Sequence, residues 1–142
     1  MAIELIDVLV AEPRGRALDL ACGSGRHAIW LASLGWDVTA VDHTEAAIPG
    51  VRFVLADLEQ HQFVIEPAAW DLIVCWLYWQ PDLLPAIARG TRPGGIAALA
   101  GKTSGRFATS VHNFRAGFPG WAELASGAAG ERAWFIARSP LQ

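Results

Sequence analysis

One stretch of the sequence constrains the fold more than any other: at residues 17–28 an apolar run stops at a small-residue turn, and a helical pattern begins directly after it. The turn fits the loose pattern Gly-x-Gly-x-x-Ala, with Gly23, Gly25 and Ala28 at its small positions. A strand, a tight turn and a helix in this order present backbone N–H groups to a nucleotide-like ligand. An ordinary strand-to-helix turn has the same pattern, so the nature of the site depends on the residues further along the chain.

Strands and helices alternate along the rest of the chain. Apolar runs predict strands at residues 16–21, 37–41, 51–55, 70–77 and 96–100, and apolar residues at helical spacing predict helices at residues 3–10, 25–34 and 81–89. The first strand is almost continuously apolar, which is typical of a strand buried on both faces of a parallel sheet. We therefore expect an α/β fold with a Rossmann-like, doubly wound and mostly parallel sheet, in one domain over residues 1–142.

The connection between the second and third predicted strands departs from this alternation of strands and helices. Only residues 43–50 separate the second and third predicted strands, whereas a parallel crossover usually takes about a dozen residues or more. Either the crossover helix is vestigial or the third strand is placed unusually.

The Arg-Pro-Gly-Gly run at residues 92–95 predicts a turn before the fifth strand, and residues 107–118 predict a short helix or a loop.

The C-terminal part of the chain predicts an antiparallel hairpin at the edge of the sheet. Residues 121–125 form its first arm, the small residues 126–130 form its turn, and the apolar run at residues 132–138 forms its second arm. The expected sheet is therefore parallel except for this C-terminal antiparallel edge hairpin.

Composition and charge exclude several classes of function. The net charge is −3 and no run of basic residues occurs, so we expect no binding to a nucleic-acid backbone. The two cysteines are too few and too far apart for a disulfide framework or a zinc site, and no metal site is expected. The first residues are acidic where a signal peptide is basic, and no apolar run reaches the roughly 20 residues of a membrane span. We expect a cytoplasmic protein with no membrane partner.

Two acids stand at the ends of predicted strands. Asp42 ends the second strand, where its carboxylate can accept hydrogen bonds from both hydroxyls of a ribose. The alternative for Asp42 is a cap on the short segment that follows it. Asp57 ends the third strand and can accept from an exocyclic adenine amine, with an ordinary solvated loop acid as the alternative.

The order of these features resembles that of class I S-adenosylmethionine-dependent methyltransferases, most of all the small proteins grouped with the tellurite-resistance and thiopurine methyltransferases. Residues 19–25 match the first motif of these proteins, an acid followed by Gly-x-Gly-x-Gly, with Ala21 in place of the first glycine. Four further elements match in order, followed by a last antiparallel strand: residues 36–42, 54–58, 70–76, 92–95 and 134–138. The resemblance runs from about residue 16 to the end of the chain.

The resemblance implies methyl transfer from S-adenosylmethionine to a small, soft or aromatic acceptor. The sulfonium of this cofactor is already activated, so the protein mainly positions the reactants and excludes water, and no catalytic base is identified. Tyr78 and Trp79 follow the fourth strand and would line the acceptor pocket, with plain packing as the alternative. The residues implied to hold the cofactor are Asp19, Ala21, Cys22, Gly23, Gly25, Arg26, Asp42, His43, Asp57, Leu58, Cys75 and Trp76.

Two other functions fit parts of the sequence. A dinucleotide-binding Rossmann domain would use Asp42 on the ribose of NAD, but Asp19, the edge hairpin and the turn at residues 92–95 favour the methyltransferase. A methyltransferase fold that binds the cofactor or a partner chain without catalysis is the other alternative, because the segments that cover the cofactor in such domains are short here. The seven tryptophans would then leave apolar surface for a homodimer to bury.

Overall fold

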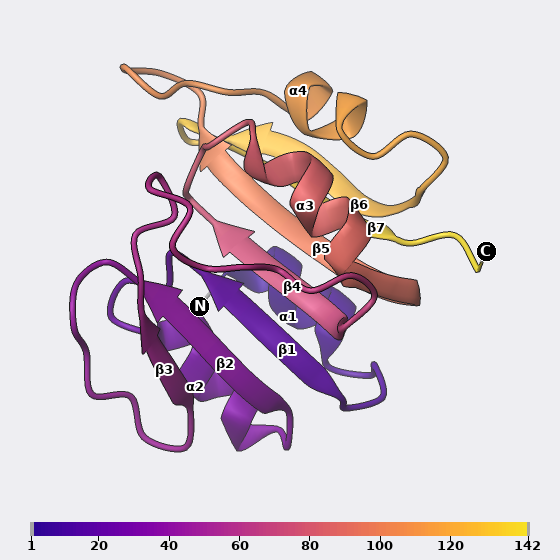
Figure 1. Ribbon diagram of the computed structural model, residues 1–142. Helices are drawn as coiled ribbons and strands as arrows, with labels where there is room; N and C mark the ends of the chain where they lie inside the picture. The colour runs from indigo at the N-terminus through magenta and orange to yellow at the C-terminus, as the bar shows by residue number, and fades with distance from the viewer. Residues whose placement is uncertain (1, 142) are drawn as a thin grey trace.

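The computed structural model describes residues 2–141 and is built on a seven-stranded sheet in the order β3-β2-β1-β4-β5-β7-β6 (Figure 1). The first five strands run parallel, and β7 pairs antiparallel with both β5 and β6. This confirms the expected Rossmann-like sheet with an antiparallel edge hairpin. The strands are β1 (Arg16–Leu20), β2 (Asp37–Asp42), β3 (Arg52–Leu55), β4 (Trp70–Trp76), β5 (Thr91–Lys102), β6 (Ala122–Ala129) and β7 (Arg132–Arg138).

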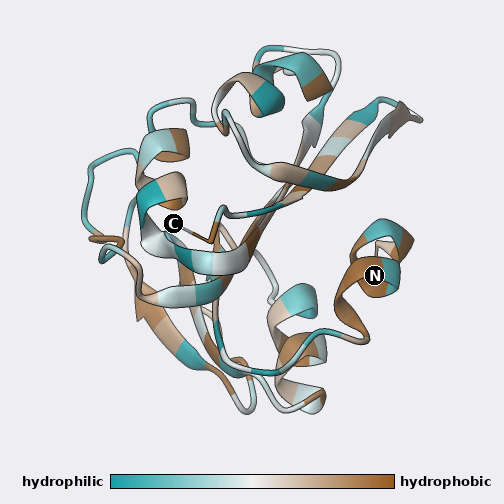
Figure 2. Cartoon of the chain, turned by 90° about the vertical axis from the view of Figure 1, so that its right-hand side faces the viewer, coloured by the Kyte–Doolittle hydropathy of each residue, from teal (hydrophilic) through white to brown (hydrophobic). Residues whose placement is uncertain are grey.

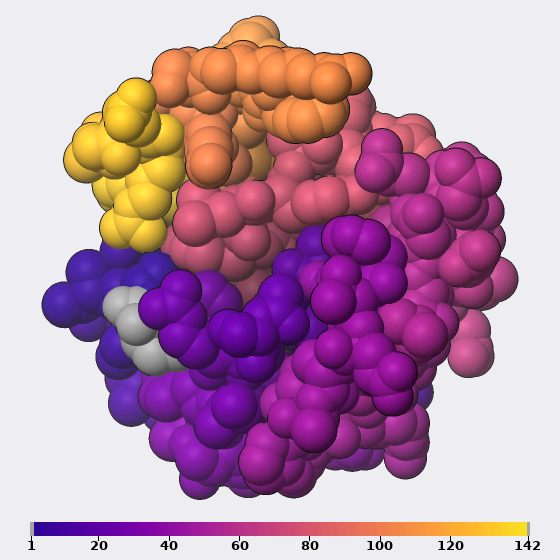
Figure 3. All heavy atoms as spheres, turned by 90° about the vertical axis from the view of Figure 1, so that its left-hand side faces the viewer, coloured from indigo at the N-terminus to yellow at the C-terminus, as the bar shows by residue number. Residues whose placement is uncertain are grey.

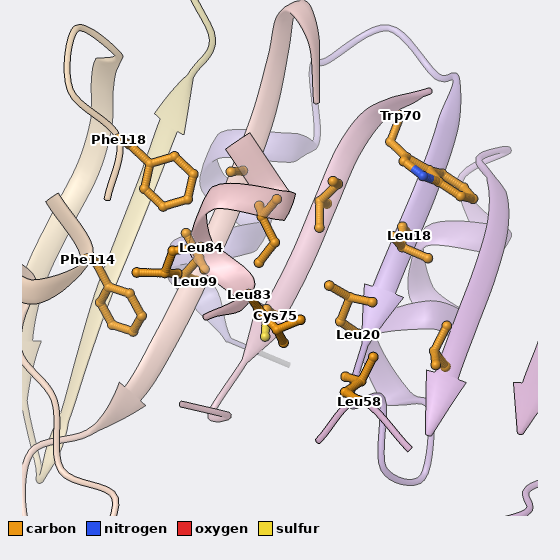
Figure 4. Packing of buried hydrophobic residues seen from close by; sticks show 14 of the residues in the cluster. Leu18, Leu20, Leu58, Trp70, Cys75, Leu83, Leu84, Leu99, Phe114 and Phe118 are labelled. Atoms are coloured by element: carbon orange, nitrogen blue, oxygen red, sulfur yellow. The ribbon is translucent and has the colours of Figure 1, made fainter. Parts of the chain in front are cut away.

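Helices cover both faces of the sheet and enclose two hydrophobic layers (Figure 2). The helices are α1 (Ile3–Leu9), α2 (Arg26–Ser33), α3 (Leu83–Gly90) and α4 (Val111–Ala116). One layer joins α1 and α2 to the sheet, and the other joins α3 and α4 to its opposite face, as Figure 4 shows for Leu83 and Phe114. Neighbours on β4 alternate between the layers, which is why this strand is apolar along its whole length: Ile73 lies in one layer and Val74 in the other.

The β2–β3 connection contains no helix, so the first of the two alternatives for this crossover is correct. β3 takes an ordinary place beside β2, in parallel register from Thr39↔Arg52 to Asp42↔Leu55. Ile48 of the connection is 7% exposed and packs in the same layer as α2. One buried side chain therefore takes the place of a crossover helix at this edge.

The turn of the C-terminal hairpin lies later in the chain than the sequence predicts. The small residues 126–130 predict the turn, but β6 continues through Ala129, and the reversal occurs at Gly130 and Glu131. Both of these residues have left-handed backbones, with φ of 55° and 64°, as a two-residue hairpin turn of the favoured twist requires. Pairing with β7 keeps the small residues extended because each faces a partner, as Ser126 faces Phe135.

The prediction of a turn at residues 92–95 is also wrong, because these residues lie inside β5. The ladder with β4 pairs Trp70 with Thr91 and then Leu72 with Ile96, so the register shifts and the extra residues bulge out. Residues 107–118 were expected to form a short helix or a loop, and α4 forms in their second half. Within the described chain, no helix has the length and apolar character needed to cross a membrane.

Candidate functional site

The turn after β1 contains two glycines that are required for different reasons. Gly23 has φ +58°, and no atom lies within 4 Å of the position that a Cβ would take, so its side faces open space. Gly25 has φ +86°, and a Cβ there would lie 2.6 Å from Cδ1 of Ile48. The Gly25 N–H donates to the Cys22 carbonyl at 3.0 Å and closes the turn. Gly23 therefore leaves room for a ligand at the backbone, and Gly25 leaves room for the core.

Ala21 also adopts a left-handed backbone, with φ +55°, at the position where the resembled motif has glycine. We expect Ala21→Gly to raise the free energy of unfolding by about 0.5–1 kcal/mol, because glycine adopts this conformation without steric cost. Urea denaturation of the variant measures the gain. Ala17→Gly in β1 is the control, since glycine in an extended buried strand destabilises the fold. An equal loss of the free energy of unfolding in both variants would contradict the prediction.

Asp42 links the end of β2 to this turn. Its side chain is almost buried, and the Gly23 N–H donates to its Oδ2 at 2.8 Å while the Thr44 N–H donates to its Oδ1 at 3.0 Å. The exposed His43 places Nδ1 3.2 Å from the same Oδ1. A carboxylate has about four acceptor positions, so Asp42 holds the turn and keeps capacity for hydroxyl donors of a ligand.

Asp19 is the most buried acid of the site. It is 2% exposed, and its Oδ2 has no hydrogen-bond partner within the described residues. Burial, together with the nearby Asp42 charge, raises its pKa to about 7, even though a hydrogen bond from the Ala28 backbone lowers it. Native buried acceptors are almost always paired, so the free oxygen indicates a position for a donor that a ligand supplies.

A small hollow brings together the ends of four strands that are far apart in the sequence. Tyr78 and Leu58 form part of its wall, and Asp57 Oδ1 accepts from the Glu59 N–H at 2.9 Å, which closes the turn after β3. We call this the smaller hollow. It is lined by Ala21, Asp42, His43, Ala56, Asp57, Leu58, Glu59 and Tyr78.

The other residues expected to hold the cofactor lie outside the lining of this hollow. Cys75 and Trp76 are 3% and 7% exposed and pack in opposite hydrophobic layers. Arg26 is exposed at the start of α2. Burial raises the pKa of both Cys22 and Cys75 to about 12, so both thiols are protonated at neutral pH and neither is an activated nucleophile. The roles assigned to these four residues stay predictions, as do the roles of all the other expected site residues.

His27 and Trp76 meet edge to face, with ring centroids 5.9 Å apart, between α2 and the end of β4. Burial, helped by the nearby Arg26 charge, lowers the pKa of His27 to about 4. The imidazole is therefore neutral at neutral pH and acts as part of the packing beside the turn.

A larger cavity of about 670 Å³ opens next to the smaller hollow, on the edge of the sheet that Figure 3 faces. Tyr78 and Trp79, expected in the acceptor pocket, both line it, and Glu59 and Tyr78 line both spaces. Sequence reasoning missed the rest of the wall. Leu77 and Gln80 flank the two expected residues, and the other side comes from the end of β5 with the segment after it and from the β6–β7 turn: Lys102, Ser104, Gly105, Arg106, Phe107, Gly130, Glu131 and Arg132. The available signal was that residues 102–107 directly follow the carboxyl end of a parallel strand, where ligands of such sheets bind.

Tyr78 is held in place by the loop that follows it. Its hydroxyl donates to Gln80 Oε1 at 2.6 Å, and Gln80 Nε2 donates to the Leu58 carbonyl at 3.1 Å. Burial, together with the nearby Glu59 charge, raises the pKa of Tyr78 to about 12. The phenol is neutral at neutral pH, its proton is engaged by Gln80, and only its lone pairs are free.

The family model described as "Tellurite resistance protein TehB" matches residues 2–78. TehB from Haemophilus influenzae, named as a probable S-adenosyl-L-methionine-dependent methyltransferase, is 39% identical over 57 residues, which are 40% of this chain and 19% of the relative. Hemagglutinin 1 from Eikenella corrodens is 35% identical over 95 residues, which are 56% of this chain and 32% of the relative. The match thus spans about a third or less of the length of each of these two curated relatives.

Two solved structures share the fold. The crystal structure of TehB from Haemophilus influenzae has a TM-score of 0.84 at 18% identity, and the match covers 98% of this chain and 62% of that one. A Burkholderia thailandensis 1,6-didemethyltoxoflavin-N1-methyltransferase, crystallised with 1,6-didemethyltoxoflavin and S-adenosylhomocysteine, has a TM-score of 0.73 at 20% identity, and the match covers 96% of this chain and 76% of that one. Because a single family model matches more than half of the sequence, the chain belongs to the tellurite resistance protein TehB family.

Proposed function

We propose that this protein binds S-adenosylmethionine across the glycine turn after β1 and the smaller hollow beside it, and transfers its methyl group to a small, soft or aromatic acceptor in the larger cavity. The observation that carries the proposal is the meeting of Ala21, Asp42 and Asp57 around one hollow, which shares Glu59 and Tyr78 with a second cavity. The methyltransferase name of TehB from Haemophilus influenzae and the S-adenosylhomocysteine bound in the Burkholderia thailandensis neighbour support it.

The residues present fit the groups of this cofactor. Asp42 lies at the tip of β2 with acceptor positions left for the two ribose hydroxyls. The unpartnered Oδ2 of Asp19 is a buried acceptor for the ammonium of the methionine moiety. The open space at Gly23 allows the ligand to approach the backbone.

Methyl transfer requires little from the protein beyond positioning the reactants. S-adenosylmethionine supplies a methyl group on a sulfonium that is ready for in-line displacement, so the chain must orient the reactants and exclude water. Tyr78 is a neutral phenol whose proton is donated to Gln80, so it is not a base at neutral pH. An acceptor that is already a soft anion needs none.

The larger cavity suits a small aromatic acceptor. Its volume of about 670 Å³ falls within the usual range for small-molecule sites, and Leu77, Tyr78, Trp79 and Phe107 provide apolar and aromatic walls. Leu77 has φ +61° and is 48% exposed at the end of β4, a strained position of the kind found at ligand sites.

The proposal predicts that calorimetric titration detects binding of S-adenosylhomocysteine and that Asp42→Ala weakens it by about 100-fold, since two charge-assisted hydrogen bonds are lost. Asp37→Ala is the matched control, because Asp37 is an exposed acid at the opposite end of the same strand. This control should bind as tightly as the wild type.

Because Asp42 also holds the Gly23 turn, thermal denaturation of both variants has to accompany the titration. Asp42→Ala should remain folded at the titration temperature while its affinity falls. If the wild type releases no heat at high micromolar concentration, or if folded Asp42→Ala binds as the wild type does, the proposed function is wrong.

A further inference from the structure

The larger cavity differs in charge from one end to the other. The end that it shares with the smaller hollow is formed by Glu59 and Tyr78. The other end is formed by residues 102–107 and by the β6–β7 turn, which lie beyond β4 in the strand order and therefore away from the ends of β1 and β2. In Figure 3 these two segments, orange and yellow, stand around the recessed pink residues that follow β4.

The far end carries cations that the chain itself does not neutralise. Neither Lys102 nor Arg106 forms an ion pair within residues 2–141, whereas Arg132 is paired with Glu4. Glu131 also lines this end, where its Oε1 accepts from the Ser104 hydroxyl at 3.0 Å. Two unpaired cations beside one acid leave a single positive charge.

The side chains of Tyr78 and Glu59 present hydrogen-bond acceptors to a ligand at the near end. The Tyr78 hydroxyl donates its proton to Gln80 Oε1 and presents its lone pairs, and Glu59 adds a carboxylate. The Gln80 amide that fixes this arrangement is itself bound to the Leu58 carbonyl. A group that enters next to the smaller hollow is therefore favoured when it carries a proton to donate.

We propose that the acceptor is a small aromatic monoanion: a protonated heteroatom faces Tyr78 and Glu59 at the near end, and a carboxylate is bound by Lys102 and Arg106 at the far end. The Glu59 carboxylate would take the proton of this heteroatom as the new bond to the methyl carbon replaces the carbon–sulfur bond of the sulfonium. The aromatic side chains of Trp79 and Phe107 line the same cavity and hold the ring. This rests on the proposed function and names the substrate class of its acceptor site.

The test is calorimetric titration of the full chain, with and without S-adenosylhomocysteine, using three probes of similar size. 4-Hydroxybenzoate has both the donor and the anion, 4-hydroxybenzamide lacks the anion, and benzoate lacks the donor. We expect 4-hydroxybenzoate to bind about tenfold more tightly than either of the others, because each end then makes a charge-assisted or directed hydrogen bond.

The variant Lys102→Gln/Arg106→Gln should bring the affinity ratio of 4-hydroxybenzoate to 4-hydroxybenzamide close to one while leaving affinity for the amide unchanged. Both residues are exposed, so the fold is preserved, and Arg89→Gln, an exposed cation on α3 outside the cavity, should keep the wild-type ratio. Equal binding of 4-hydroxybenzoate and 4-hydroxybenzamide by the wild type, a ratio unchanged in the double variant, or no binding of 4-hydroxybenzoate overturns the inference. Failure of S-adenosylhomocysteine to bind in the same cell would instead overturn the proposed function.

Discussion

Replacing Asp19 with asparagine is expected to remove a pH dependence of folding stability of about 4 kcal/mol between pH 4 and pH 7. The folded-state pKa of Asp19 is raised from its ordinary value of 3.8 to about 7, first by burial and then by the charge of Asp42. Between these values the folded chain holds a proton that the unfolded chain has released. This group therefore stabilises the fold fully below pH 4 and loses its contribution as the pH rises to 7, with no further change above.

The measurement is the free energy of unfolding in urea for wild type and Asp19→Asn at several pH values from 4 to 8. The advantage of the wild type over the variant should fall steadily up to pH 7 and then stay constant. His27 acts in the opposite direction, because its folded-state pKa is lowered to about 4 and the unfolded chain binds the extra proton. The variant alone should therefore gain stability as the pH rises from 4 to 6.5. A difference between the two proteins that does not change with pH would contradict the prediction.

Gly23→Ala should mainly weaken ligand binding and Gly25→Ala should mainly destabilise the fold, although both glycines lie in one turn. Gly25→Ala is expected to lower the free energy of unfolding by about 2–3 kcal/mol, because it combines a left-handed backbone with overpacking against Ile48. Gly23→Ala meets no atom within 4 Å and should lower it by only about 1 kcal/mol. Its new methyl group would occupy the open space beside the backbone, so affinity for S-adenosylhomocysteine should fall by about tenfold or more.

Urea denaturation and calorimetric titration of both variants check this pair. Ile48→Val supplies the control for packing, because valine lacks the Cδ1 atom that lies 2.6 Å from the added methyl group. Combined with Gly25→Ala, it should recover about 1 kcal/mol relative to the sum of the single changes. Equal effects of the two glycine substitutions on stability would show that the turn does not divide its roles in this way.

Much of the framework could be predicted from the sequence, because the patterns that encode it are local. The apolar runs of β1, β2 and β4 reflect burial of each strand on both faces, and the glycines after β1 reflect backbone angles that other residues adopt at a cost. Asp42 follows its strand directly, so its place at the sheet edge was predictable, and the structure brings it to the Gly23 N–H. The ligand-binding roles of Asp42 and of all the other expected site residues stay predictions.

Pairing between strands determined the features of the fold that local sequence patterns failed to predict. Residues 126–130 have the composition of a turn, yet the β7 ladder holds 126–129 in β6, and residues 92–95 were drawn into β5 as a bulge for the same reason. The buried Ile48 packs in the same layer as α2, where a crossover helix would otherwise lie. No periodicity in residues 43–50 predicts this packing.

The sequence by itself determined the succession of strands along the chain, the glycine turn and the acids at the strand ends, since each depends on neighbouring residues. Only the tertiary structure decided the larger cavity and its charges. Its walls join Tyr78, Arg106 and Arg132, which are separated by dozens of residues and meet because β4, β5 and β7 lie side by side. A surface made by strand order carries no local pattern, so the cavity proposed as the acceptor site forms only when the sheet is assembled.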